Sequence, residues 1–217
     1  MTFHTLIKKV YRNMEDYGCW GAMKKILCYA FGMIVYEKRI YRIYRIKLTN
    51  YEPVEPSPSD FVYKMITEKD TSIIKQIENM AEWLEGELAG MLKDKSICLA
   101  ALENGKLAGF NLVNFGDVYI PLIKRNKTFH DGEAWSEHIA VHKDFRKRGL
   151  ASQLRYRILA ELKNRGIERF YGGTLRHNEP ALKLTRRVGF KEMIDVSYIK
   201  LFGVKRWKYE KVKNENV

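Results

Sequence analysis

The sequence predicts a mixed α/β fold of the α+β kind, with strands and helices arranged around one small-residue loop. Residues 135–163 begin WSEHIAVHKDFRKRGLA and have the pattern of a short apolar strand, a basic loop and an amphipathic helix. Residues 178–200 have the pattern of a second helix, ended by Gly189, and a strand. Asn104-Gly105 between two apolar runs predicts a β-hairpin. A chain of 217 residues can bury the core of one domain with an appendage.

The loop that precedes the first helix has the composition of a phosphate-binding site. The first N–H groups of a helix have no intrahelical partner, and the helix dipole favours anions there. Gly149 has no Cβ to hold a ligand away from the backbone, and Ala151 is small. Three consecutive basic residues add positive charge. The candidate binding residues are Arg146, Lys147, Arg148, Gly149, Leu150 and Ala151.

Two motifs of the chain resemble those of the GCN5-related N-acetyltransferase (GNAT) family. The first is the loop Arg146-x-x-Gly149-x-Ala151, which in that family binds the pyrophosphate of acyl-CoA and follows a strand ending like Ile139-Ala140-Val141. The second is NEPALKLTRRVGF, residues 178–190, which matches the family pattern of Asn-x-x-Ala, a short helix and then Gly-Phe. The resemblance covers residues 61–202, and the first 60 residues show no family match.

This resemblance implies a fold, a reaction and a set of binding residues. The implied fold is a mixed, mostly antiparallel central sheet, flanked by helices and splayed around an acyl-CoA cleft. The implied reaction is direct transfer of an acyl group, most simply acetyl from acetyl-CoA, to a primary amine. Backbone N–H groups of Ile139, Ala140 and Val141 would bind the pantetheine arm and polarise the thioester carbonyl. Asn178 would bind the cofactor, although capping its own helix explains it equally well.

Direct transfer requires a base that removes a proton from the attacking amine. Glu137 is the first candidate, because on a regular strand it has the same parity as Ile139 and Val141 and would face the cofactor cleft. The alternative interpretation of Glu137 is a structural carboxylate paired with an arginine. His138 is the second candidate, because its ordinary pKa suits the task and a β-bulge would turn it toward the cleft.

The leaving thiolate has no obvious proton donor in this sequence. The family often carries a tyrosine for this purpose four residues after the alanine of the second motif, and this chain has Thr185 at that position. Tyr171, Tyr198 or a water would have to serve instead. The departure also leaves open a protein that binds CoA and transfers slowly or not at all.

Composition limits the partners. The formal net charge of +13 favours acidic partners such as nucleotides, anionic lipids or acidic surfaces. Cys19, Cys28 and Cys98 have no metal-binding spacing, and an odd count without a signal peptide predicts reduced thiols in the cytoplasm. No metal-binding pattern, nucleophile elbow, P-loop or dinucleotide fingerprint is present, so no other enzyme class is indicated.

Residues 1–50 form a basic N-terminal extension, with helical patterns at 3–14 and 20–31 and an Arg/Tyr/Ile run at 39–47 that favours a strand. Two interpretations compete. The extension packs on the acetyltransferase core, which we favour slightly, or it lies on an anionic membrane or nucleic acid. The second interpretation gives the alternative function, a catalytically degenerate GNAT-fold binding protein at the membrane periphery. No RNA-binding motif supports a specific nucleic-acid partner.

Residues 51–60 hold three of the five prolines and predict a linker before a catalytic domain at 61–212. Within that domain, the two helices predicted at 71–84 and up to residue 93 would form one wall of the acceptor cleft. The long connection at 114–132 would shape the same site. Strands are predicted at 61–66, 97–102, 107–113, 169–174, 191–200 and 204–212, and the closing strands could pair across a homodimer.

Overall fold

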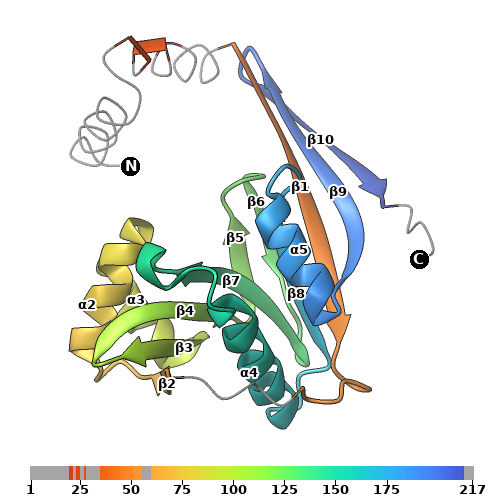
Figure 1. Cartoon of the computed structure of the whole chain (residues 1–217). Helices are drawn as coiled ribbons and strands as arrows, with labels where there is room; N and C mark the ends of the chain where they lie inside the picture. Colours follow the sequence, from red (N-terminus) through yellow and green to blue (C-terminus); the bar gives the residue numbers. More distant parts are fainter. Residues whose placement is uncertain (1–19, 22, 25–26, 28–34, 55–59, 213–217) are drawn as a thin grey trace. The chain divides into compact units, whose positions relative to one another are not determined.

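The computed structural model describes residues 20–21, 23–24, 27, 35–54 and 60–212 (Figure 1). The chain forms two compact units. We call Tyr41–Asp195 with Glu210–Val217 the core unit, and Met1–Ile40 with Val196–Tyr209 the extension unit. The helix predicted at 3–14 lies outside the described residues, and the helix predicted at 20–31 lies largely outside them.

An eight-stranded sheet in the order β10-β9-β1-β8-β7-β4-β3-β2 is the main feature of the fold. β7 and β8 pair in parallel, whereas the pairs β1–β8, β2–β3, β3–β4 and β4–β7 are antiparallel, which confirms the predicted mixed, mostly antiparallel sheet. The strands are β1 Tyr36–Lys47, β2 Val62–Ile66, β3 Ser96–Glu103, β4 Lys106–Asn114, β7 Glu133–Val141, β8 Arg169–Leu175, β9 Lys191–Leu201 and β10 Val204–Lys211.

The helices begin and end where local signals place them. In α5 the Asn178 side chain accepts a hydrogen bond from the N–H of Ala181 at 3.3 Å, and Gly189, with φ of 95°, closes the helix. The helical segments are α2 Thr71–Met80, the 3-10 turn η1 Glu82–Leu84, α3 Leu88–Asp94, the 3-10 turn η2 Lys143–Phe145, α4 Leu150–Asn164 and α5 Glu179–Val188.

Alternation along the strands divides the core between two faces of the sheet. Val113 packs in a cluster with Leu154 and Ile158 of α4, and we call this side the α4 face. Its neighbour Leu112 packs with Ile77 of α2 and Leu84 of η1, and we call that side the α2 face. The sheet therefore has helices on both sides, as Figure 1 shows.

β1 fits against β8 because β8 carries two consecutive glycines. A Cβ on Gly172 would lie 2.5 Å from the ring of Tyr44, and a Cβ on Gly173 would lie 2.2 Å from the ring of Tyr41. Contacts that short do not occur in proteins, so both positions require glycine. The strand predicted at 39–47 is thus confirmed, and residues 41–47 pair with β8. The domain boundary predicted at 51–60 stays a prediction.

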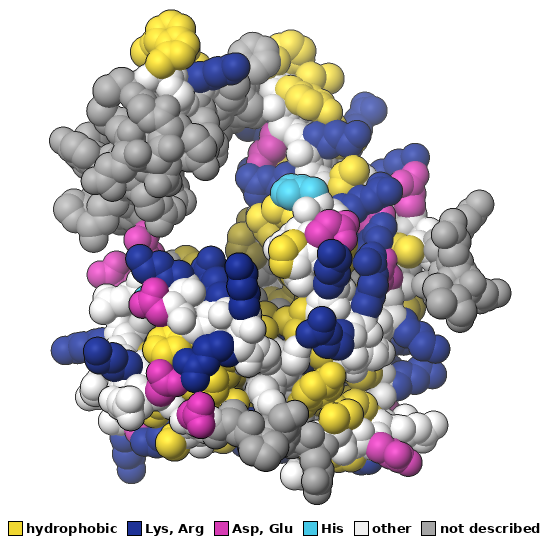
Figure 2. Space-filling model, viewed as in Figure 1, with side chains coloured by type: hydrophobic (Ala, Val, Ile, Leu, Met, Phe, Trp, Pro, Cys, Tyr) yellow, Lys and Arg dark blue, Asp and Glu magenta, His cyan; other side chains and the backbone are white. Residues whose placement is uncertain are grey.

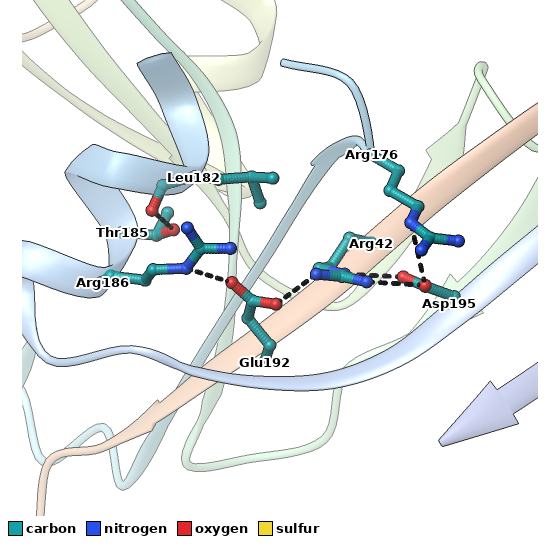
Figure 3. A network of polar contacts seen from close by, with 7 residues as sticks. All are labelled: Arg42, Arg176, Leu182, Thr185, Arg186, Glu192 and Asp195. Atoms are coloured by element: carbon teal, nitrogen blue, oxygen red, sulfur yellow. Dashed lines mark hydrogen bonds and ion pairs between the residues drawn. The ribbon is translucent and has the colours of Figure 1, made fainter. Parts of the chain in front are cut away.

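A network of ion pairs joins β1 to the start of β9 in the core unit (Figure 3). Arg42 donates two hydrogen bonds to the carboxylate of Asp195, each 2.7 Å long, and a third to Glu192. Arg186 of α5 donates to the other oxygen of Glu192 at 2.6 Å, and Arg176 lies 3.8 Å from Asp195. The side chains of Asp195 and Glu192 are 9% and 11% exposed, so Arg42 neutralises carboxylates that water hardly reaches.

Replacing Arg42 with leucine is expected to lower the free energy of unfolding by on the order of 3 kcal/mol, because two largely buried carboxylates lose their shared cation. Arg165→Ala is the matched control. It removes an exposed i,i+4 pair with Glu161 and is expected to cost about 0.5 kcal/mol or less. Urea unfolding of both variants measures the difference. Equal losses would contradict the importance of the network.

The structure adds three points to the sequence-based expectations. The connection at 114–132 contains a two-stranded sheet, β5 Asp117–Ile120 and β6 Arg125–Thr128, instead of an irregular loop. Among the described residues, no helix is long and apolar enough to cross a membrane. Within the same residues, no group of three or more His, Cys, Asp and Glu side chains could hold a metal ion.

Candidate active site

β7 and β8 pair only at their first residues and then separate. The parallel ladder ends at the pair Trp135–Tyr171. Beyond it, β7 stays paired with β4 on its other side, and β8 stays paired with β1. The sheet is therefore open between residues 136–141 of β7 and residues 172–175 of β8. We call this gap in the ladder the β7–β8 opening; it matches the splayed sheet that the resemblance implies.

A pocket of about 370 Å³ lies at the N-terminus of α4. Gly149 is the N-cap of this helix and has φ of 74°, a left-handed conformation that glycine adopts without strain. The lining contains four basic and no acidic side chains, and Figure 2 shows dark blue side chains around this part of the surface. The lining residues are Val141, Phe145, Arg146, Lys147, Gly149, Leu150, Ala151, Ser152, Pro180, Lys183, Leu184 and Arg187.

These residues fit a diphosphate. α4 has fifteen residues, so its first turn offers unpaired N–H groups and a full helix dipole to an anion. Arg146 and Lys147 come from the loop, whereas Lys183 and Arg187 come from one side of α5, four residues apart. The pocket thus places cations from two elements around one helix N-terminus, which suits the two phosphates of an acyl-CoA.

The structure brings together most of the predicted cofactor residues but not all of them. Arg148 lies outside the pocket, because its guanidinium donates to Glu103 at 2.7 Å and stacks on the ring of Phe61 at 4.5 Å. Asn178 uses its side chain to cap α5. Sequence reasoning missed Lys183 and Arg187, although their i,i+4 spacing within the second motif was a readable signal. The cofactor roles of Arg148 and Asn178 stay predictions.

Glu137 sits at a β-bulge beside the β7–β8 opening. Leu112 of β4 pairs with His138 and Val113 pairs with Ser136, so Glu137 has no partner across the ladder. Its carboxylate accepts hydrogen bonds from the amide of Asn114, at 3.1 Å, and from the Trp135 side chain. Burial raises the pKa of Glu137 from 4.5 to about 6, and these two hydrogen bonds oppose the rise.

The bulge corrects the parity argument made from the sequence. Ile139 and Val141 pack against the cluster on the α4 face, whereas Glu137 bonds to Trp135 and Asn114. Trp135 and Asn114 alternate with residues of the α4 face, so Glu137 faces the α2 side. The alternative pairing of Glu137 with an arginine does not occur among the described residues, where its hydrogen-bond partners Asn114 and Trp135 are neutral.

His138 is enclosed by aromatic rings on the α2 face. Its imidazole lies 5.6 Å from the ring of Trp83 in η1 and 5.6 Å from the ring of Phe110. Burial lowers the pKa of His138 below its usual 6.5, so the ring is neutral near pH 7. Trp83 is half exposed and therefore forms an accessible aromatic wall beside the bulge.

The β5–β6 hairpin packs on the same side of the sheet as Glu137. Phe129, just after β6, stacks on Trp135 at 5.5 Å and contacts Tyr171 at 5.5 Å. These two residues are the last parallel pair before the opening. The connection that sequence reasoning assigned to the acceptor side is thus anchored at the closed end of the β7–β8 opening.

A buried arginine lies at the closed end of the opening on the α4 face. Arg155 of α4 is 1% exposed and donates a hydrogen bond to the Ser136 hydroxyl at 2.9 Å. Its guanidinium lies over the rings of Phe170 and Phe190 at 5.4 and 5.6 Å. No carboxylate among the described residues pairs with it, its Nε lacks a partner there, and burial lowers its pKa. Sequence reasoning missed this charge, although the spacing of Ile158, Leu159 and Leu162 places Arg155 on the apolar stripe of the helix.

Thr185, which stands at the usual tyrosine position, and the candidate donor Tyr171 both have other partners. The hydroxyl of Thr185 is buried and donates to the carbonyl of Leu182 at 2.8 Å (Figure 3). Tyr171 donates its hydroxyl to Glu133 at 3.0 Å. Tyr44 is a better placed phenol, because its hydroxyl would lie 3.0 Å from a Cβ on Gly172, the first β8 residue past the parallel pairs.

Comparisons with known proteins agree with this geometry. The model of the acetyltransferase (GNAT) family matches residues 41–190. A tandem GNAT protein from the clavulanic acid biosynthesis pathway gives a TM-score of 0.58 at 15% identity, over 82% of this chain and 59% of that one, so the chain spans less than two thirds of it. A GCN5-related N-acetyltransferase-like protein from Streptococcus suis gives a TM-score of 0.56 at 16% identity, over 83% of this chain and 68% of that one.

An aminoglycoside N-acetyltransferase in complex with CoA gives a TM-score of 0.48 at 21% identity, over 60% of this chain and 92% of that one. No curated protein matches the chain. At these identities the solved structures show the fold alone.

Proposed function

Because the chain belongs to the acetyltransferase (GNAT) family, we propose that it transfers the acetyl group of acetyl-CoA directly to a primary amine. The observation that carries the proposal is the connection between the basic pocket at the start of α4 and the β7–β8 opening. Val141 belongs to both, since it ends β7 and lines the pocket. A diphosphate held in the pocket would direct an attached pantetheine arm along the open edge of β7.

The two faces of the sheet suggest how the reactants meet. Acetyl-CoA would bind on the α4 face, with its diphosphate among Arg146, Lys147, Lys183 and Arg187. The amine would approach from the α2 face, beside Trp83 and the β5–β6 hairpin. The thioester and the amine would then meet through the opening, next to the bulge at Glu137.

Glu137 is proposed as the base. Its pKa of about 6 leaves the carboxylate ionised at neutral pH and still basic enough to accept a proton from an ammonium group or through a water. The freed nitrogen lone pair attacks the thioester carbon, the new C–N bond forms, and the C–S bond breaks to release CoA as a thiolate. The nitrogen loses a second proton as it becomes an amide, and this loss balances the proton that the thiolate takes up. Backbone N–H groups of Ile139, Ala140 and Val141 are proposed to bind the pantetheine arm and polarise the carbonyl. His138, neutral and enclosed, remains the second candidate base.

Arg155 and Tyr44 are proposed to serve the leaving thiolate. The positive charge of Arg155 favours negative charge at the closed end of the opening, where burial weakens screening by water. Tyr44 lies in the field of Arg155, which opposes the rise that burial causes in the pKa of its phenol. A phenol in this position can donate the proton that Thr185 does not supply.

Replacing Arg155 with methionine is expected to raise the free energy of unfolding by about 1 kcal/mol, because a buried charge without a counter-ion disappears. The same variant is expected to lose at least about tenfold in kcat. Thermal unfolding and a thiol-release assay measure the two quantities. A less stable variant with unchanged kcat would show that Arg155 only supports packing.

An amine screen tests the proposed function. The full chain is incubated with acetyl-CoA and single amines, including aminoglycosides, amino sugars, polyamines and lysine peptides, and free thiol is followed. The expected result is amine-dependent thiol release with an equimolar acetylated amine. Binding of acetyl-CoA without transfer to any amine would favour the degenerate binding protein. The observation that supports this alternative is Thr185, whose hydroxyl donates to the carbonyl of Leu182 and supplies no proton to a thiolate.

A further inference from the structure

The turn between β9 and β10 exposes an apolar tip. Leu201, Phe202 and Val204 are 49%, 74% and 59% exposed, and Gly203 lies between the last two. We call residues 201–204 the hairpin tip. Phe202 has φ of 45°, a conformation that a bulky residue adopts rarely. A large aromatic side chain therefore occupies a strained position in which it is held outward.

The chain segment around the hairpin tip is basic. Residues 196–209 read VSYIKLFGVKRWKY and contain four Lys or Arg and no Asp or Glu. Lys205 and Arg206 follow the tip directly, and both side chains are exposed. Lys200 precedes the tip. The apolar tip thus lies between positive charges on both strands.

Exposed apolar side chains are concentrated in the extension unit. Twelve large hydrophobic side chains are exposed in the described part of the chain, and eight of them belong to this smaller unit. Exposed apolar surface bordered by polar groups marks interaction sites. The eight are Trp20, Met23, Leu27, Tyr36, Leu201, Phe202, Val204 and Tyr209.

We propose that the hairpin tip inserts into the headgroup region of an anionic membrane, with Lys205 and Arg206 contacting acidic lipids. Apolar side chains enter the boundary of the acyl chains, and nearby cations are attracted by the negative surface potential. A second copy of the chain fits less well, because two such hairpins would bring their cations together. Nucleic acid also fits less well, because Leu201 and Val204 offer no ring on which a base can stack.

Vesicle binding of the full chain tests this inference without acetyl-CoA. Sedimentation is measured with phosphatidylcholine vesicles and with vesicles that contain phosphatidylserine. The chain is expected to bind only the anionic vesicles, with an affinity that falls as salt rises. In a Phe202→Trp variant, the tryptophan emission is expected to shift to the blue on binding. No binding to anionic vesicles, or equal binding to neutral ones, would overturn the proposal.

Paired variants separate the hairpin tip from the rest of the surface. The double variant Leu201→Ser, Phe202→Asn is expected to weaken vesicle binding at least about tenfold. Asparagine is chosen because it tolerates the left-handed backbone conformation at position 202. The double variant Lys205→Glu, Arg206→Glu is expected to abolish binding, since each positive charge near an anionic surface raises the membrane affinity about fivefold. Two control variants change exposed residues of the core unit. Val62→Ser is the control for the apolar substitutions, and the double variant Lys69→Glu, Lys106→Glu is the control for the charge reversals.

Two further outcomes would also overturn the proposal. Tip variants that bind vesicles as well as the wild type would place any membrane contact elsewhere in the chain and overturn the proposal. A dimer in sedimentation equilibrium that the tip variants abolish, without vesicle binding by the wild type, would show that a second copy covers the tip.

Discussion

Replacing Glu137 with glutamine is expected to lower kcat by roughly 10²- to 10⁴-fold while acetyl-CoA still binds, because the amide cannot accept the amine proton. In the wild type, kcat/KM is expected to rise with pH and level off above a pKa of about 6, where the carboxylate becomes ionised. A pH–rate profile measures both effects. The acidic limb with this pKa should disappear in Glu137→Gln.

His138→Gln provides the comparison, because His138 also titrates below its usual pKa of 6.5. It should retain the acidic limb and most of the rate. If the limb survives in Glu137→Gln and disappears in His138→Gln, the histidine is the base and the assignment of Glu137 is wrong.

The stability of the free protein gives an independent reading of Glu137. Its folded-state pKa is raised from 4.5 to about 6, so the folded protein binds this proton more tightly than the unfolded chain. The protonated carboxyl therefore contributes stability below pH 4.5, and this contribution is lost as pH rises through 6. Glu137→Gln is expected to unfold at a higher temperature than the wild type at pH 8. A purely structural carboxylate would give the opposite sign.

Replacing Gly149 with glutamate is expected to weaken acetyl-CoA binding at least about 100-fold, a loss of about 2.7 kcal/mol in binding free energy. The new residue would have to adopt φ of 74°, and its carboxylate would enter a pocket lined by four cations at the anion-binding end of α4. Calorimetric titration of acetyl-CoA into the variant measures the loss.

Gly166→Glu is the matched control for Gly149→Glu. Gly166 has φ of 76°, lies past the other end of α4, and, like Gly149, has no atom within 4 Å of an added Cβ. Both variants therefore carry similar backbone strain and the same added charge. Gly166→Glu should lose stability and retain binding. Equal binding by the two variants would contradict the assignment of the loop.

Local signals predicted the fold well, because each was a short-range effect of named residues. Asn104-Gly105 forms the β3–β4 turn with both residues at positive φ, and Gly189 ends α5 as expected. Residues 114–132 were expected to be one long connection, because β6 is entirely polar, although β5 carries the buried residues Val118 and Ile120. They form a hairpin that Phe129 anchors by ring contacts, and such contacts depend on tertiary structure.

The site was predicted less completely, because its chemistry depends on one irregularity and on long-range packing. The bulge at Glu137 reverses the face that simple alternation assigns to it, and no local pattern in the sequence fixes a bulge. Arg155 lies on the apolar stripe of α4, three and four residues before Ile158 and Leu159, and sequence reasoning did not single it out although it is buried against two phenylalanine rings. Arg148 belonged to the loop motif and points to Glu103 instead.

The proposed function depends on binding of acetyl-CoA at the start of α4, with the acetyl end in the β7–β8 opening. We would test this binding by thermal melting of the wild type with and without acetyl-CoA. At a hundredfold excess over the dissociation constant, the ligand is expected to stabilise the folded protein by about 2.7 kcal/mol, and free CoA should also stabilise it through the diphosphate. No shift with acetyl-CoA, longer acyl-CoAs or free CoA would contradict the claim.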